Sequence, residues 1–246
     1  MQNTHHDQLA HFLDGFRRRT IGVLGDYMLD EVLRGEATRI SPEAPVPVVL
    51  IDKPGATEGY PGGAGNVAAN VTALGGKAIP WGVIGADESG RRLIALLKSH
   101  GIPPATLASE RGRMTPRKLR ITAHQHQLLR LDFEKLRPAS SASRARLARS
   151  MREQMPRLDA LIVSDYQKGS VDSDLCKEIL PLARAQSVPV FVDPKPPHLD
   201  PCTQATVVTP NLREAEIMAG MPMRTSAAIE KGGRLLDDSQ PAEARL

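Results

Sequence analysis

Residues 61–76 read "PGGAGNVAANVTALGG", and the interpretation of the whole chain depends on this stretch. Gly62, Gly63 and Ala64 provide almost no side chain before a run of helix length, and Asn66 stands where that run turns apolar. Such a stretch suits a tight turn that leads into a buried helix. It equally suits a bare backbone surface against which a polar ligand can lie. The surrounding sequence is needed to choose between these two interpretations.

Apolar runs with strand character lie on both sides of this stretch and end in polar residues. The first run, residues 20–25, is followed by Asp26, and later runs lead into Asp165, Asp193 and Asn211. Segments with helical spacing of apolar residues alternate with these runs. Strands that alternate with helices form parallel sheets, which bind ligands at the carboxyl ends of their strands. The sequence therefore predicts an α/β fold with a doubly wound, mostly parallel sheet.

Other segments extend this pattern. Residues 46–52 and 78–85 are predicted strands, and a helix that stops at Gly101 is expected after the second of them. Residues 117–133 contain two runs in which polar and apolar side chains alternate, which predicts an antiparallel hairpin with one solvent-facing side. Residues 237–246 show no strand pattern.

Composition excludes several classes of function. A chain of 246 residues is long enough for one large domain or two small ones. The formal charge of +4 is modest and aromatic residues make up only 3%, so a nucleic-acid-binding face is not expected. Apolar stretches of membrane-spanning length are absent, and the two cysteines lack the spacing of a metal or redox motif. We expect a cytoplasmic protein without membrane or nucleic-acid partners.

The glycine-rich stretch resembles the N-terminal signature of the ribokinase-like (phosphofructokinase-B type) sugar kinases. The resemblance rests on seven positions at fixed spacing, namely Gly62, Gly63, Ala64, Asn66, Ala68, Gly75 and Gly85. Five further segments are similar to one branch, the heptose-7-phosphate kinases of lipopolysaccharide precursor synthesis. These segments are "GDYMLDEVLRGEATRISPEAPVPVV", "RKLRITAHQHQLLRLDFE", "SDYQKGS", "VDPK" and "TPNLREAE". In many bacteria such a kinase forms the first half of a bifunctional kinase/adenylyltransferase.

The resemblance implies a three-layer α/β/α sandwich with a small β lid. Residues 1–246 would form one kinase domain, and the lid would comprise roughly residues 31–53 and 112–133. A homodimer formed through the β lid is implied as well. The activity implied is ATP-dependent phosphorylation of D-glycero-β-D-manno-heptose 7-phosphate at the anomeric hydroxyl, with Mg²⁺ as cofactor.

The resemblance also assigns residues to the sugar substrate. Sugar hydroxyls would contact the bare backbone of the glycine turn, a carboxylate and an amide, which are supplied by Gly62, Gly63, Asp26 and Asn66. The phosphate already present on the sugar would need cations, because guanidinium and ammonium groups bind phosphate. The candidates in the lid segments are Arg39, Lys118, Arg120 and Arg130.

The nucleotide would lie across the other part of the sheet edge. Lys195 of "VDPK" is placed to meet the ATP phosphates, and Asp193 would orient it or a metal-bound water. In "TPNLREAE", Asn211 and Glu214 match the Asn-x-x-Glu motif of the family, and Arg213 lies between them. Glu214 would hold Mg²⁺ through water, since Mg²⁺ keeps several waters. Alternatively, Asn211 caps the following helix and Glu214 completes a capping box.

The sequence departs from the family pattern at two places. The catalytic aspartate of the family lies in a Gly-Ala-Gly-Asp stretch near the C-terminus, which this sequence does not contain. The general base is therefore unassigned, and the kinase fold is expected to be incomplete at its C-terminal end. Pro196 also stands where the family usually has glycine. Two alternatives stay open, namely an inactive remnant that at most binds sugar phosphate and another ribokinase-family sugar kinase.

Overall fold

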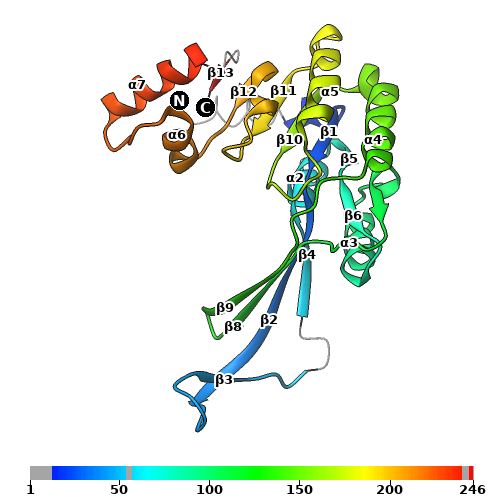
Figure 1. Ribbon diagram of the computed structural model, residues 1–246. Coiled ribbons are helices and arrows are strands. Elements are labelled where there is room, and N and C mark those ends of the chain that lie inside the picture. The colour runs from blue at the N-terminus through cyan, green and yellow to red at the C-terminus, as the bar shows by residue number, and fades with distance from the viewer. Residues whose placement is uncertain (1–12, 54–56, 240–243, 246) are drawn as a thin grey trace.

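The computed structural model in Figure 1 describes residues 13–53, 57–239 and 244–245. In this part of the chain, the central sheet has the strand order β13 (Ala244–Arg245), β12 (Val207–Val208), β11 (Val190–Asp193), β10 (Ala160–Ser164), β1 (Thr20–Gly25) and β5 (Lys77–Trp81). Every neighbouring pair in this sheet is parallel. The predicted parallel α/β sheet is therefore confirmed.

Helices cover both faces of the central sheet. The α-helices are α2 (Ala64–Ala73), α3 (Glu88–Ser99), α4 (Ser141–Gln154), α5 (Ser173–Ala185), α6 (Leu212–Ala219) and α7 (Ser226–Ser239). Short 3₁₀ helices are η1 (Pro104–Thr106), η2 (Met155–Arg157) and η3 (Asp200–Gln204). Helices α4 and α5 contact each other, and α2 packs on β5 and β1.

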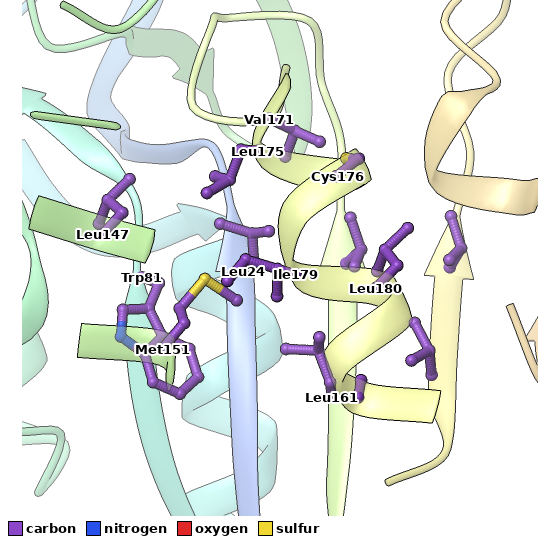
Figure 2. Close-up of a cluster of buried hydrophobic side chains, with 14 of the residues drawn as sticks. Leu24, Trp81, Leu147, Met151, Leu161, Val171, Leu175, Cys176, Ile179 and Leu180 are labelled. Carbon is purple, nitrogen blue, oxygen red and sulfur yellow. The ribbon is translucent and has the colours of Figure 1, made fainter. Parts of the chain in front are cut away.

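Successive residues of β1 contribute to two different hydrophobic cores, because side chains alternate across a strand. Leu24 belongs to a cluster with buried residues of α4 and α5, including Leu147, Met151 and Ile179 (Figure 2). Its neighbour Val23 belongs to a second cluster with buried residues of α2 and α3. The sheet is thus the middle layer of an α/β/α sandwich, as expected.

A second sheet extends away from the helix-covered body (Figure 1). Its strands are β2 (Tyr27–Ile40), β3 (Pro47–Leu50), β4 (Thr57–Gly63), β8 (Arg117–Ala123) and β9 (His126–Phe133). Strands β8 and β9 form the antiparallel hairpin predicted from alternation. The expected lid segments fall largely in this sheet, which also takes in β4 and the start of β2. We call it the lid sheet, and its action as a lid stays a prediction.

The two sheets are joined directly. Strand β1 ends at Gly25 and β2 begins at Tyr27, so Asp26 alone separates a strand of the central sheet from a strand of the lid sheet. The backbone oxygen of Asp26 also accepts a hydrogen bond from the N–H of Ala64, at 3.1 Å. Asp26 thereby connects the sheet junction to the first residue of α2.

Two details differ from expectation. The strand predicted over residues 78–85 is divided at Gly82, and β6 (Val83–Gly85) leaves the central sheet to pair with β7 (Ala108–Glu110). A Cβ on Gly82 would collide with the carbonyl oxygen of Gly25, so glycine is required at this position. Residues 244–245 form the short strand β13 through backbone pairing with β12. The rest of the segment after residue 239 lies outside the described residues.

None of the helices in the described part of the chain is both long enough and apolar enough to span a membrane.

Candidate active site

The carboxyl edge of the central sheet gathers the polar residues that end its strands. Gly25 lies opposite Ser164 in the β1–β10 pair, and Ser164 lies opposite Asp193 in the β10–β11 pair. Asp26 and Asp165 therefore follow neighbouring strand ends, with Asp193 at the end of the next strand. This edge is where parallel α/β sheets bind ligands.

Asp26 holds a loop. Its carboxylate is buried and accepts hydrogen bonds from the backbone N–H groups of Tyr166, Lys168 and Ser170, with N···O distances of 3.0, 2.8 and 2.9 Å. Burial raises the pKa of Asp26, and these backbone donors act in the opposite direction. Both carboxylate oxygens are engaged in this way, so the structure places Asp26 under the loop. Its predicted contact with sugar hydroxyls stays a prediction.

Asp30 lies beside Gly62 and is more exposed than Asp26. Its side chain is 27% exposed, and its Oδ1 lies 2.7 Å from Nη1 of Arg120. A Cβ on Gly62 would collide with the Asp30 carboxylate, which shows how closely the two approach. Sequence reasoning missed Asp30, although it is the second aspartate of "GDYMLD". Asp30 could have been found from the alternation of side chains along β2, which places Asp30 and Glu31 on opposite faces of the strand.

The glycines at the end of β4, just before α2, are required by the local backbone. Gly63 has φ 56° and precedes α2, and a Cβ there would collide with the backbone oxygen of Asp26. A side chain at this position is excluded both by conformation and by space. Asn66 lies exposed in the first turn of α2, just beyond this junction. Gly62, Gly63 and Asp30 therefore lie together at the base of the lid sheet, and Asn66 follows on α2; its predicted contact with the sugar stays a prediction.

Three of the four predicted phosphate-binding cations lie on the Asp30 face of the lid sheet. Asp30 pairs with Lys118, and Arg120 pairs with Arg130, in the registers of β2–β8 and β8–β9. The three cations form ion pairs with carboxylates of the same face. Lys118 Nζ lies 3.2 Å from Asp132 Oδ2, and Arg130 Nε lies 2.9 Å from Asp132 Oδ1.

Arg39 is not brought to this cluster within the chain. It pairs with Val48 of β3, toward the far end of β2, and is exposed. Arg39 lies nine positions after Asp30, which is about 30 Å along an extended strand. Within one chain Arg39 is therefore remote from Arg120, and its predicted role in phosphate binding stays a prediction.

The predicted nucleotide-binding residues also come together. Lys195 Nζ lies 3.2 Å from Glu214 Oε1. Asn211 caps α6 by accepting a hydrogen bond from the Glu214 N–H, and its own N–H donates to the Glu214 carboxylate, each bond being 3.0 Å long. The capping box is thus confirmed, and it leaves Oε1 of Glu214 directed to Lys195. Burial and the nearby Glu214 charge raise the pKa of Asp193, while Lys195 opposes this shift. Arg213 is exposed on the first turn of α6.

A second loop contact was not foreseen. His198 Nδ1 lies 2.6 Å from Asp165 Oδ2, and Gln167 Nε2 donates to the carbonyl oxygen of Lys195 at 2.6 Å. The hydrogen bond to Asp165 is the main cause that raises the pKa of His198. These contacts join the loop after β10 to the loop that carries Lys195. The segment "SDYQKGS" was part of the family resemblance, but no function was predicted for any of its residues.

The donor set at this edge fits Mg²⁺ when a nucleotide supplies part of its coordination. Among the described residues, no group of three or more histidine, cysteine, aspartate or glutamate side chains could hold a metal ion. Asp193 and Glu214 are two carboxylates near Lys195, and Mg²⁺ is commonly held by one or two carboxylates, waters and substrate phosphates. The residues therefore fit a metal that arrives with phosphate.

Comparison with known proteins identifies the family. The profile of the pfkB family of carbohydrate kinases matches residues 28–238, which include the glycine turn, Asp30 and the Lys195–Glu214 pair. The chain belongs to the pfkB family. This confirms the resemblance drawn from the glycine-rich stretch, and it makes the edge described above the candidate active site of a carbohydrate kinase domain.

The curated relatives of this pfkB-family chain carry the name bifunctional protein HldE. The relative from Caulobacter vibrioides is 37% identical over 227 residues, which is 92% of this chain and 46% of the relative. The relative from Alcanivorax borkumensis is 40% identical over 238 residues, which is 97% of this chain and 47% of the relative. The chain thus spans about half the length of the curated relatives it matches.

Solved structures support the fold of the pfkB-family chain. Phosphofructokinase-2 from Escherichia coli in complex with fructose-6-phosphate aligns with a TM-score of 0.66 at 19% identity, covering 92% of this chain and 71% of the enzyme. The tetrameric inhibited form of the same enzyme aligns with a TM-score of 0.65. At this identity the likeness establishes the ribokinase-like fold.

Proposed function

We propose that this chain is a kinase domain that binds D-glycero-β-D-manno-heptose 7-phosphate and phosphorylates its anomeric hydroxyl with ATP. The observation that carries the proposal is the position of Asp30 beside Gly62, with Lys118, Arg120 and Arg130 on the same face of the lid sheet. A carboxylate suits sugar hydroxyls, and three cations suit a phosphate already on the substrate. ATP and a sugar phosphate also fit a cytoplasmic protein that supplies lipopolysaccharide precursors.

In this proposal one part of the sheet edge binds the sugar and the other part binds the nucleotide. Asp30 accepts hydrogen bonds from sugar hydroxyls, and the absence of a side chain at Gly62 leaves room for the Asp30 carboxylate. Lys195 binds the phosphates of ATP, and Glu214 contacts Mg²⁺ through water; the metal neutralises charge on the phosphates when it is bound. Asp193 orients Lys195 or a metal-bound water. These groups position the two reactants for an in-line transfer.

The general base is not assigned within this chain, because the sequence lacks the Gly-Ala-Gly-Asp stretch of the family. A positioned base typically contributes about 10²–10⁴-fold to the rate. We therefore expect the 246-residue chain to bind sugar phosphate and to turn over slowly or not at all. Slow ATP-dependent turnover would support the kinase, and binding without any turnover would support the second candidate, an inactive form that retains binding.

The partner proposed is a second copy of the chain. The face of the lid sheet opposite Asp30 carries Leu129, which is 50% exposed, Leu131 at 36% and Phe133 at 40%. Burial of these side chains between two lid sheets would remove apolar surface from water. Sedimentation velocity with the wild type and with Leu129→Glu tests this. A dimer that is lost in the variant supports the lid interface, and a monomeric wild type contradicts it.

Isothermal titration calorimetry tests the substrate. The purified chain is titrated with the heptose 7-phosphate, with the same heptose lacking phosphate and with fructose 6-phosphate. Tightest binding of the heptose 7-phosphate is expected. Preference for fructose 6-phosphate would identify another sugar kinase of the family, and equal affinity for the two heptoses would contradict a phosphate-binding site in the lid.

A further inference from the structure

The loop from Asp165 to Ser170 is held in one conformation at the carboxyl edge of the sheet. Three of its backbone N–H groups donate to Asp26, and Asp165 accepts from the N–H of Gln167 at 2.7 Å. Gln167 has φ 55°, a left-handed conformation that costs energy for a residue other than glycine. Hydrogen bonds on both sides maintain this conformation. The loop therefore presents the next residue, Lys168, in a defined direction.

Lys168 extends from this loop to the lid sheet. Its Nζ lies 2.8 Å from Oε1 of Glu134, the residue that follows β9. The other oxygen of Glu134 lies 3.8 Å from Nζ of Lys118, which comes from β8. Two ammonium groups, one from the central body and one from the lid sheet, thus converge on a single carboxylate. All three side chains are partly exposed, with side-chain exposed fractions of 17%, 18% and 27% for Lys168, Lys118 and Glu134.

The charges around this point favour a more strongly charged anion than a carboxylate. Four cations lie in the cluster, namely Lys118, Arg120, Arg130 and Lys168. Three carboxylates accompany them, namely Asp30, Asp132 and Glu134. One positive charge is therefore in excess. A phosphate monoester carries nearly two negative charges and three acceptor oxygens, so it satisfies two ammonium groups better than one shared carboxylate does.

We propose that Lys168 binds the phosphate of the sugar substrate together with Lys118. When the substrate is absent, Glu134 holds Lys168, and Asp132 and Glu134 together hold Lys118. The phosphate replaces Glu134. Asp26 is a positioning residue in this arrangement, because it fixes the backbone that presents Lys168. The inference rests on the proposed function, since it concerns the same substrate, and it adds a cation from outside the lid sheet.

Two variants with opposite expected effects test the role of Lys168. Lys168→Met keeps the aliphatic stem and removes the charge, and Glu134→Gln removes the competing carboxylate charge. Calorimetry measures Kd for the heptose 7-phosphate and for the heptose without phosphate. For Lys168→Met we expect Kd for the phosphorylated sugar to rise about 10- to 100-fold, as for a lost charge-assisted hydrogen bond, with no change for the other sugar. For Glu134→Gln we expect Kd to fall about 2- to 5-fold.

The control is Lys177→Met, which removes the same charge from an exposed position on α5. It should leave both Kd values unchanged. If Lys168 and Glu134 only support the loop, both variants weaken binding of the two sugars alike, and this result would overturn the proposal. Thermal unfolding of each variant distinguishes a weakened site from a weakened fold.

The design separates this inference from the proposed function. A wild-type chain that prefers the phosphorylated sugar, combined with an unchanged Kd in Lys168→Met, contradicts only the role of Lys168. A wild-type chain without that preference contradicts the proposed function, and the role of Lys168 fails with it.

Discussion

The guanidinium of Arg120 lies 2.7 Å from the carboxylate of Asp30, and this ion pair joins β8 to β2 on one face of the lid sheet. A single ligand that contacts both residues would present a hydroxyl to Asp30 and an anionic group to Arg120. A phosphorylated sugar has both groups. The pair thus links the two halves of the proposed recognition.

Asp30→Asn tests the proposed role of the Asp30 carboxylate in sugar binding. The amide keeps the size of the side chain but loses the charge and one acceptor, so we expect Kd for the heptose to rise about 10- to 100-fold. Glu36→Gln, an exposed position on the same strand, is the matched control. Calorimetry gives both values, and equal affinities of Asp30→Asn and the wild type would remove Asp30 from the site.

Asp26→Asn tests whether this residue is structural. Its three backbone donors need carboxylate acceptors, and an amide nitrogen would face one of them, so we expect a loss of about 2–3 kcal/mol in the free energy of unfolding. Urea titration measures this, with the exposed Asp14→Asn as control. Unchanged stability together with weaker sugar binding would instead favour direct contact between Asp26 and the sugar.

Glu214→Gln tests the nucleotide side. The amide oxygen can still accept from the Asn211 N–H, so the capping box is retained, but the charge near Lys195 is lost. We expect the Mg²⁺ dependence of binding of a non-hydrolysable ATP analogue to weaken at least about 10-fold, as for a charged hydrogen bond, while Kd for the heptose stays constant. The opposite pattern, altered sugar affinity with unchanged Mg²⁺ dependence, would show that the assignment is wrong.

The His198–Asp165 pair predicts a pH dependence of stability. Its hydrogen bond raises the pKa of His198 in the folded chain, so the pair stabilises the fold fully below the ordinary histidine pKa of about 6.5. This contribution is lost as the pH rises through the raised pKa. We expect Tm of the wild type to exceed that of His198→Asn most at pH 6, and the difference to shrink toward pH 9. A difference that grows with pH would contradict this.

Local patterns were sufficient to predict the central sheet. Strands β1, β10 and β11 are short apolar runs followed by a polar residue, and helices with one buried face lie between most of the strands of the sheet. The capping box was equally predictable, because Asn211 and Glu214 interact within one helical turn. Such features depend on neighbours in the sequence.

The choice between Asp26 and Asp30 could not be made from the sequence. Both belong to "GDYMLD", and the position of the junction between β1 and β2 determines which of the two carboxylates is buried. Lys168 was missed because its partners, Asp26 and Glu134, are 142 and 34 residues away in the chain. The separation of Arg39 from the other cations likewise depends on the length of β2. These relationships arise from the tertiary fold.

The junction at Asp26 has a mechanical consequence. No flexible linker stands between β1 and β2, and the connecting residue is anchored to α2 through Ala64 and to the loop after β10 through its carboxylate. A force on the far end of the lid sheet would be transmitted through β2 and Asp26 to the parallel strands of the central sheet. Arg92 and Arg117 form ion pairs with Glu31 near this junction, so any bending of the lid sheet would be confined to β2 beyond Glu31, and the base of the proposed sugar site would stay in place.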